Sequence, residues 1–263
     1  MNNSELGRVQ AFLLKHRIAE TKAARRNISR EERDVATILR DADPQMRTLL
    51  EEVLDGQGLA LQSFREFDVA GIPAGAMTFV LARKPDTNPP FFGTERLVSR
   101  MKQLGRYKVS DTEIKIWFTQ LWFVLLDLLY TKKSRSPGAM QDWVDTAFNR
   151  LVFADAVKNY INDSVLKMDP ASLKTTAIYD ALTSAKEGTV TQLCSAFIEV
   201  MEDASLLERL EEDVYRQSLL FAFEMKMNYD RQLVPLLPAL MPFDAASAVL
   251  IEDVEEVVHG NNH

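Results

Sequence analysis

Residues 111–130 read DTEIKIWFTQLWFVLLDLLY and form the most apolar stretch of the chain. Ser110 and Glu113 mark its start as a capping box, because each side chain can accept a hydrogen bond from the other residue's backbone N–H. Gln120 and Asp127 interrupt the apolar part, residues 116–130, which is also shorter than the roughly 20 apolar residues of a membrane span. We therefore predict a helix that other helices bury on most sides.

The flanking sequence extends this pattern to a mainly α chain. Apolar residues recur every three or four positions in most segments, which indicates amphipathic helices. Ser29 with Glu32, and Asp43 followed by Pro44, are two further helix-start signals. We predict helices at about residues 4–26, 35–39, 44–55, 94–104, 111–130, 140–167, 172–185, 189–201 and 206–233.

The period of the sequence changes after Gly56 and Gly58. Apolar and other residues alternate from residue 59, and residues 77–82 (MTFVLA) are the clearest strand of the chain. We predict one small antiparallel β-hairpin, formed by residues 59–67 and 76–82 with a long turn between them. Three helices followed by a hairpin is the order of a winged-helix module. The alternative is a helical domain with an added hairpin.

Proline-rich segments divide the chain. Residues 83–93 (RKPDTNPPFFG) hold three prolines and are the best linker candidate. We predict a helix-plus-hairpin unit at 1–82, a helical bundle at 94–237 and an acidic tail at 238–263. The tail is either a frayed last element or a segment that docks onto a partner or onto the body of the protein. Its candidate docking residues are Val249, Leu250, Ile251, Val254 and Val257.

The composition is that of a globular protein, with 46% hydrophobic and 26% charged residues among 263. This apolar content excludes disorder over most of the chain. The single Cys194 excludes a disulfide scaffold and fits a reducing compartment. The first 20 residues mix apolar and charged positions, unlike a secretory signal. We expect a cytoplasmic protein without a membrane segment.

The formal net charge of −7 is unevenly distributed. Residues 1–135 hold 22 Lys and Arg against 17 Asp and Glu, whereas residues 136–263 hold 9 against 21. Either the two halves attract each other, or two surfaces serve two partners, one of them anionic. The candidate contacts to an anionic partner or nucleic acid are Arg83, Lys84, Arg96, Arg100, Lys102, Arg106, Lys108, Lys132, Lys133 and Arg135, with Arg17, Lys22, Arg25 and Arg26 as a further option.

Reversing the charges of Arg100, Lys102 and Arg106 is expected to weaken binding to an anionic partner if that segment is the contact. The helices themselves are poor readers of DNA. Residues 44–55 carry Arg47 among three acids, and residues 189–201 hold no Lys or Arg.

The sequence offers no catalytic or cofactor motif. His259 and His263 have helical ligand spacing but lie in a Gly-Asn-rich end, and Cys194 sits among apolar residues. Gly71 and Gly75 flank a proline and lack the following G-K-[ST] of a phosphate loop. We assign no catalytic, cofactor-binding or metal-binding residue, expect no cofactor, and do not expect an enzyme.

The leading hypothesis is a non-enzymatic subunit or adaptor of a larger assembly. Its acidic half would engage a protein partner, its basic half a second partner or nucleic acid, and homo-oligomers are compatible with this role. The order of helices, hairpin and helical extension over about residues 30–130 resembles the winged-helix accessory subunits of SMC-type ATPases. This resemblance rests on element order, and it implies a subunit that bridges the ATPase, a kleisin-like chain and DNA without chemistry of its own.

An enzyme with an unfamiliar site is the remaining alternative. It predicts a deep pocket lined by ionisable groups. His16 and Asp127 are the residues near which such a pocket is expected. Asp127 either pairs with a Lys or Arg, or marks the place where the apolar helix meets water.

Overall fold

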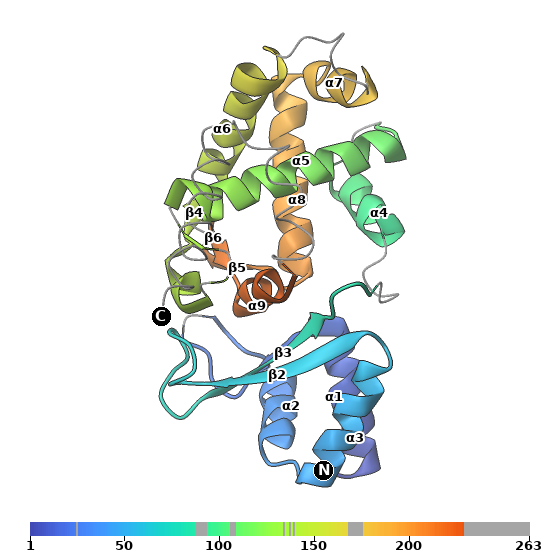
Figure 1. The fold of residues 1–263 in the computed structure, drawn as a ribbon, viewed down its shortest axis with the longest axis vertical. Coiled ribbons are helices and arrows are strands. Elements are labelled where there is room, and N and C mark those ends of the chain that lie inside the picture. The colour runs from blue at the N-terminus through green and yellow to red at the C-terminus, as the bar shows by residue number, and fades with distance from the viewer. Residues whose placement is uncertain are drawn as a thin grey trace, which may run out of the picture.

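The structure is a computed structural model that describes residues 1–24, 26–87, 94–105, 109–133, 135–136, 138, 140–167 and 176–228. These residues are mainly helical, and they include two antiparallel sheets of three strands each (Figure 1). The mainly α prediction is confirmed. The prediction of one hairpin is wrong, because a second sheet lies in the C-terminal half.

The first sheet and three helices form the N-terminal unit. Its elements are α1 (Asn3–His16), β1 (Ile18–Glu20), α2 (Arg30–Arg40), α3 (Pro44–Asp55), β2 (Leu59–Arg65) and β3 (Met77–Arg83). The sheet order is β1-β3-β2, and Val80 in the central strand lies opposite Ile18 and Gln62. The predicted hairpin is therefore confirmed, with a third strand added at its edge.

Local signals explain where the N-terminal helices begin. The side chains of Ser29 and Asp43 accept hydrogen bonds from the backbone N–H groups of Glu32 and Met46, as their spacing predicts. The first helix ends earlier than predicted, because Arg17 adopts a left-handed conformation with φ 62°. A non-glycine residue gives no sequence signal for that turn, so the sequence does not predict β1.

The C-terminal unit is a helical bundle around α5. Its elements are α4 (Thr94–Gly105), α5 (Asp111–Leu129), η2 (Thr131–Lys133), η3 (Met140–Asp145), β4 (Phe148–Asn149), α6 (Arg150–Tyr160), η4 (Ile161–Val165), α7 (Thr176–Thr183), α8 (Glu187–Asp203), β5 (Leu207–Glu211), β6 (Val214–Gln217) and α9 (Leu219–Asn228). Both hydrogen bonds of the Ser110–Glu113 capping box form. Leu121, Leu125 and Leu129 of α5 are completely buried, as the apolar run predicts.

The second sheet corrects two predicted helices. Residues 207–217 form a hairpin, and the short strand β4 separates η3 from α6 within the predicted helix 140–167. The sheet order is β4-β6-β5, and Tyr215 lies opposite both Phe148 and Arg209. The residues of β5 and β6 also fit a helical spacing, but in the fold they pair with each other as antiparallel strands, and β4 adds to the free edge of β6.

The two units share one order of elements that the sequence does not reveal as a repeat. In each unit a helix precedes the first strand, and further helices separate that strand from a hairpin. In each sheet the first strand pairs with the last strand, which also pairs with the second. The chain therefore builds the same arrangement twice, from α1 to β3 and from α5 to β6.

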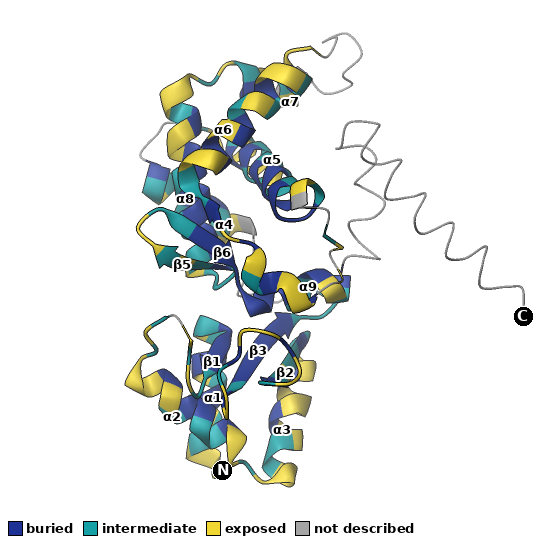
Figure 2. Ribbon diagram, turned by 90° about the vertical axis from the view of Figure 1, so that its left-hand side faces the viewer, coloured by how far each residue is buried: buried dark blue, intermediate teal, exposed yellow. Residues whose placement is uncertain are grey.

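Helix α9 joins the two units. It lies across the face of the first sheet that α1–α3 leave open (Figures 1 and 2). Ile18, Phe64 and Val80 from that sheet share a buried cluster with Leu219 and Leu220 from α9. No helix within the described segments combines the length and apolar character needed to cross a membrane.

Candidate functional site

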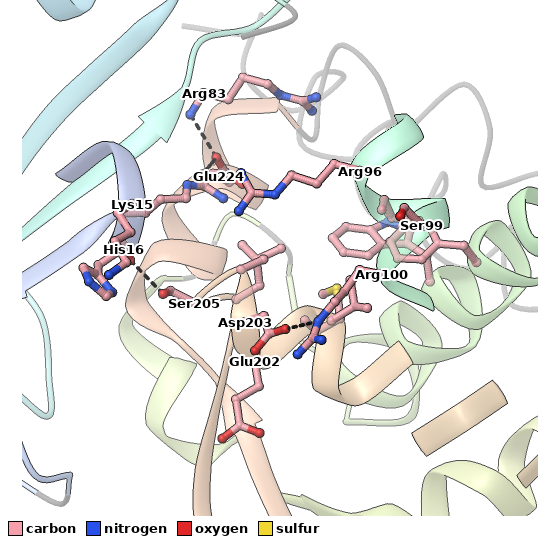
Figure 3. A pocket seen from close by; sticks show the side chains of 18 of the residues that line it. Lys15, His16, Arg83, Arg96, Ser99, Arg100, Glu202, Asp203, Ser205 and Glu224 are labelled. Atoms are coloured by element: carbon pink, nitrogen blue, oxygen red, sulfur yellow. Dashed lines mark hydrogen bonds and ion pairs between the residues drawn. The ribbon is translucent and has the colours of Figure 1, made fainter. Parts of the chain in front are cut away.

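A cleft of about 830 Å³ lies between the two units (Figure 3). Its walls come from the end of α1, the end of β3, one face of α4, the middle of α5, the turn after α8, and α9. Apolar side chains contribute part of the lining, including Leu97, Phe118, Trp122 and Leu206. The charged residues that line it are Lys15, His16, Arg17, Arg83, Arg96, Arg100, Glu202, Asp203 and Glu224.

The most buried charges in the cleft hold the units together. Arg17 and Glu224 form an ion pair, and their side chains are 5% and 18% exposed. The same Glu224 carboxylate accepts a hydrogen bond from the backbone N–H of Arg83 at 2.9 Å. Burial lowers the pKa of Arg17, and the Glu224 charge opposes this shift. This carboxylate therefore has a structural role at the junction.

The other two acids of the cleft are also engaged. Arg100 Nε donates to Asp203 at 2.7 Å, and Arg209 donates to Glu202 at 2.7 Å. In the described part of the chain, by contrast, no ion pair involves the side chains of Lys15, Arg83 or Arg96. The cleft is consequently cationic, and its unpaired positive charges lie beside apolar side chains.

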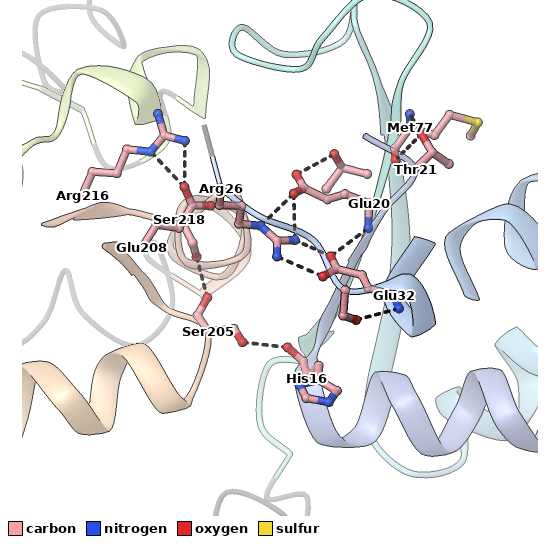
Figure 4. Close-up of polar contacts among 12 residues, drawn as sticks. His16, Glu20, Thr21, Arg26, Glu32, Met77, Ser205, Glu208, Arg216 and Ser218 are labelled. Carbon is pink, nitrogen blue, oxygen red and sulfur yellow. Dashed lines mark hydrogen bonds and ion pairs between the residues drawn. The ribbon is translucent and has the colours of Figure 1, made fainter. Parts of the chain in front are cut away.

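His16 lies in a cleft lined by ionisable groups, the kind of pocket that the enzyme hypothesis predicts. Its own contacts, however, stabilise the fold. Its ring packs against Phe12 with centroids 4.5 Å apart, and its backbone carbonyl accepts a hydrogen bond from Ser205 Oγ at 2.7 Å (Figure 4). Burial, followed by the charge of Lys15, lowers the pKa of the imidazole. The Ser205 hydroxyl is directed to the backbone and not to the ring, so this pair does not form an activated nucleophile.

Cys194 and Asp127, the other candidate reactive groups, also have structural surroundings. Cys194 is completely buried in the core of α8, and burial raises its thiol pKa to about 12. Asp127 forms an ion pair with Lys132 at 3.7 Å, at the end of α5. Among the described residues, no three His, Cys, Asp or Glu side chains are grouped to hold a metal ion. His259 and His263 lie outside these residues.

The structure brings together only some of the basic residues singled out from the sequence. Arg83, Arg96 and Arg100 meet in the cleft, with Arg17 from the N-terminal segment. The cleft also contains residues that sequence reasoning missed, above all Lys15, Trp122 and Glu224. The sequence does single out Glu224, since it is the one acidic residue in the apolar run of α9.

Other candidate contacts are engaged by neighbouring residues. Lys84 pairs with Asp55, and Lys102 pairs with Asp111. Arg135 donates to the carbonyl of Leu129 at 3.1 Å and lies over the ring of Tyr130. Two of the three basic residues that we predict to contact an anionic partner in segment 100–106, Arg100 and Lys102, face carboxylates in this structure. Arg106, Lys108, the Lys133 side chain and the tail residues 249–257 lie outside the described residues.

Exposed apolar residues form a second surface feature. Leu49 and Val53 lie one turn apart on α3 and are both exposed, next to the exposed Glu52. On α6, Leu151 is 63% exposed, and Val152 beside it is also exposed. Large apolar side chains that remain in water at adjacent positions are typical of protein contacts.

Neither a protein-family model, nor a curated protein, nor a solved structure matches the chain. Two features of the structure therefore bear on the function of the chain. One is the cationic cleft between the units, and the other is the exposed apolar surface of α3 and α6.

Proposed function

We propose that the chain is a non-enzymatic adaptor subunit built from two winged-helix modules in tandem. The shared order of elements supports this proposal most strongly. A winged-helix module runs helix, strand, helix, helix, strand, strand, and its first strand pairs with its last. Residues from α1 to β3 follow this order, and residues from α5 to β6 follow it with α7 inserted.

The helices that precede the two hairpins favour protein contacts over DNA reading. In DNA-binding modules of this kind, that helix enters the major groove with its side chains toward bases and phosphates. Here α3 exposes Leu49, Glu52 and Val53, and α8 contains no Lys or Arg. Carboxylates facing phosphates are repelled, whereas exposed apolar side chains gain free energy when a protein partner covers them.

Isolation of the assembly tests this function. The tagged full chain is expressed in its native host and purified gently, with and without nuclease, and co-purifying proteins are identified by mass spectrometry. We expect a stoichiometric protein partner that survives nuclease. A clean monomer without any partner would contradict the adaptor role.

Matched variants locate the contact. Leu49→Asp with Val53→Asp places charges on the α3 face and is expected to reduce recovery of the partner at least tenfold. Leu166→Asp with Ile178→Asp makes the same chemical change at exposed apolar positions elsewhere and should retain the partner. Equal recovery with both double variants would show that α3 is not the contact.

A DNA-associated accessory subunit of an SMC-like ATPase complex is the second candidate function. The tandem order of elements favours it, since two winged-helix modules suit a bridging subunit. This role predicts that the co-purified partner is an ATPase. It also predicts DNA affinity that falls steeply between about 50 and 200 mM salt, because basic side chains displace counterions. Salt-independent binding or no binding would leave the protein-only adaptor.

An enzyme with its site in the cleft is the third candidate function. The ionisable lining around His16 favours it. Against it, the described residues of the cleft contain no hydrogen-bonded pair of nucleophile and base. Substitution of His16 by Gln separates the cases: a catalytic imidazole would make a co-purifying activity depend on this residue, whereas partner recovery would not change.

A further inference from the structure

The cleft combines two properties that point to a ligand of mixed character. Lys15, Arg83 and Arg96 contribute positive charge without an ion-pair partner in the described part of the chain. Phe118 and Trp122 present partly buried aromatic surface in the same cavity. A small inorganic anion would use the charges and leave the aromatic surface in water. A peptide that alternates acidic and apolar residues would use both.

The chain itself contains such a peptide. Residues 239–263 hold five acids and no Lys or Arg, and residues 248–258 read AVLIEDVEEVV. We propose that the cleft between the two units is the docking site of the chain's own segment 244–258. Its carboxylates would face Arg83 and Arg96, and its Val, Leu and Ile side chains would cover Trp122.

The position of α9 makes this docking geometrically accessible. Glu224 lines the cleft and Asn228 ends α9, one helical turn or about 6 Å further along the chain. Residue 248 follows Asn228 by 20 residues, a length of chain that can span at most about 66 Å. The tail therefore leaves the described structure beside the cleft, with enough chain to turn back into it.

Docking within one chain has a thermodynamic consequence. A tethered segment acts at an effective concentration on the order of millimolar, so even a weak peptide site is mostly occupied. Acidic segments of other proteins then have to displace the tail before they can enter the cleft. The tail would act as a built-in competitor whose release exposes the basic surface.

A binding measurement tests the proposal with full-length proteins. The probe is a fluorescein-labelled peptide of residues 244–263, followed by anisotropy at 50 mM salt. The natural chain is compared with a tail variant that carries Val249→Ser, Leu250→Ser, Ile251→Ser, Glu252→Gln, Asp253→Asn, Glu255→Gln and Glu256→Gln. We expect the tail variant to bind the peptide at least tenfold more tightly, since its own tail no longer competes.

Cleft variants in the tail-variant background place the binding site. Arg83→Glu with Arg96→Glu is expected to weaken peptide binding at least tenfold. Arg30→Glu with Arg33→Glu makes the same net charge change at exposed positions on α2 and should bind like the parent. Circular dichroism confirms folding. Lys15→Glu, at an exposed position, is a second test if the double variant unfolds.

Three results would overturn the proposal. The first is no peptide binding to the tail variant, and the second is equal binding by the natural chain and the tail variant. The third is equal binding by the Arg83/Arg96 double variant and the Arg30/Arg33 double variant. Equal binding by natural chain and tail variant would assign the cleft to a partner's segment instead. A natural chain that dimerises with concentration, together with a monomeric tail variant, would assign it to the tail of a second copy.

The inference is independent of the adaptor function. It rests on the cleft, whereas the adaptor test uses the exposed residues of α3. A failed peptide titration leaves partner recovery unchanged, and loss of the partner in the Leu49 and Val53 variant leaves the titration unchanged. The two outcomes are therefore distinguishable.

Discussion

Arg26 shows how single residues bury charge in this protein. Its guanidinium donates to Glu20 at 2.8 Å and to Glu32 at 3.0 Å, and both carboxylates are largely buried (Figure 4). One cation therefore pairs with two carboxylates between β1 and α2. Burial raises the pKa of Glu20, and the charge of Arg26 opposes that shift.

Replacing Arg26 by Ala should therefore destabilise the protein in a pH-dependent way. Removing one partner of a buried ion pair typically costs about 3–5 kcal/mol, and we expect about 3 at pH 7 because Arg26 is partly exposed. Without Arg26 the folded-state pKa of Glu20 rises further. The contribution of Glu20 to the free energy of unfolding is then largest below its unfolded-state pKa of about 4.3. This contribution is lost as the pH rises through the folded-state pKa.

Urea unfolding at pH 7 and pH 5 measures this effect. The free-energy deficit of Arg26→Ala relative to the natural chain should be smaller at pH 5. Arg33→Ala, at an exposed position on α2, should change stability by less than about 0.5 kcal/mol at both pH values. An identical deficit at the two pH values would argue against a buried Glu20 charge.

At the level of elements, the turn between β2 and β3 docks onto η3 of the other unit. Trp143 Nε1 donates to the carbonyl of Ala70 at 2.8 Å. Gly71 has φ +87°, and a Cβ there would overlap with Val144 Cγ1. Position 71 therefore requires glycine for two reasons: its left-handed backbone conformation, and the close approach of the neighbouring unit.

Gly71→Ala is expected to cost about 3 kcal/mol, from left-handed strain of about 1–2 and overpacking of about 1–3. Gly75→Ala in the same turn is the matched control. It has φ +69°, but a Cβ added there would meet no atom within 4 Å, so it should show only the backbone cost of about 1–2 kcal/mol. Urea unfolding measures both, and equal losses would mean that the turn does not press against η3.

At the scale of the whole molecule, α9 links the two units. It places apolar residues against the first sheet and directs Glu224 toward Arg17, which is 207 positions away in the chain. A shared helix and a shared ion pair couple the stability of the units. We expect one cooperative thermal transition for the natural chain.

Glu224→Ala should weaken that coupling. It leaves the Arg17 guanidinium buried without this carboxylate, at a cost of about 3–5 kcal/mol. Differential scanning calorimetry should show a lower midpoint and a broadened or split transition. Glu52→Ala, at an exposed position on α3, should leave the transition unchanged. A single sharp transition at the natural midpoint in Glu224→Ala would show that the ion pair does not join the units.

Local sequence determined a large part of the helical structure. Ser29, Asp43 and Ser110 mark helix starts because a cap needs only residues three positions apart. The apolar run of α5 predicts its own burial, and the alternation around residues 59–82 predicts the first hairpin. Each of these signals lies within one contiguous segment, so no knowledge of distant neighbours is needed.

Tertiary structure alone decided the remaining strands and the cleft. β1 and β4 are strands because distant strands pair with them, whereas β5 and β6 pair mainly with each other, and β4 adds to the free edge of β6. The sequence supplies the basic residues but not which of them remain unpaired: Lys102 is neutralised by Asp111, whereas Arg96 faces the cleft. Pairing energies depend on distances across the fold, and a linear pattern contains the charges without those distances.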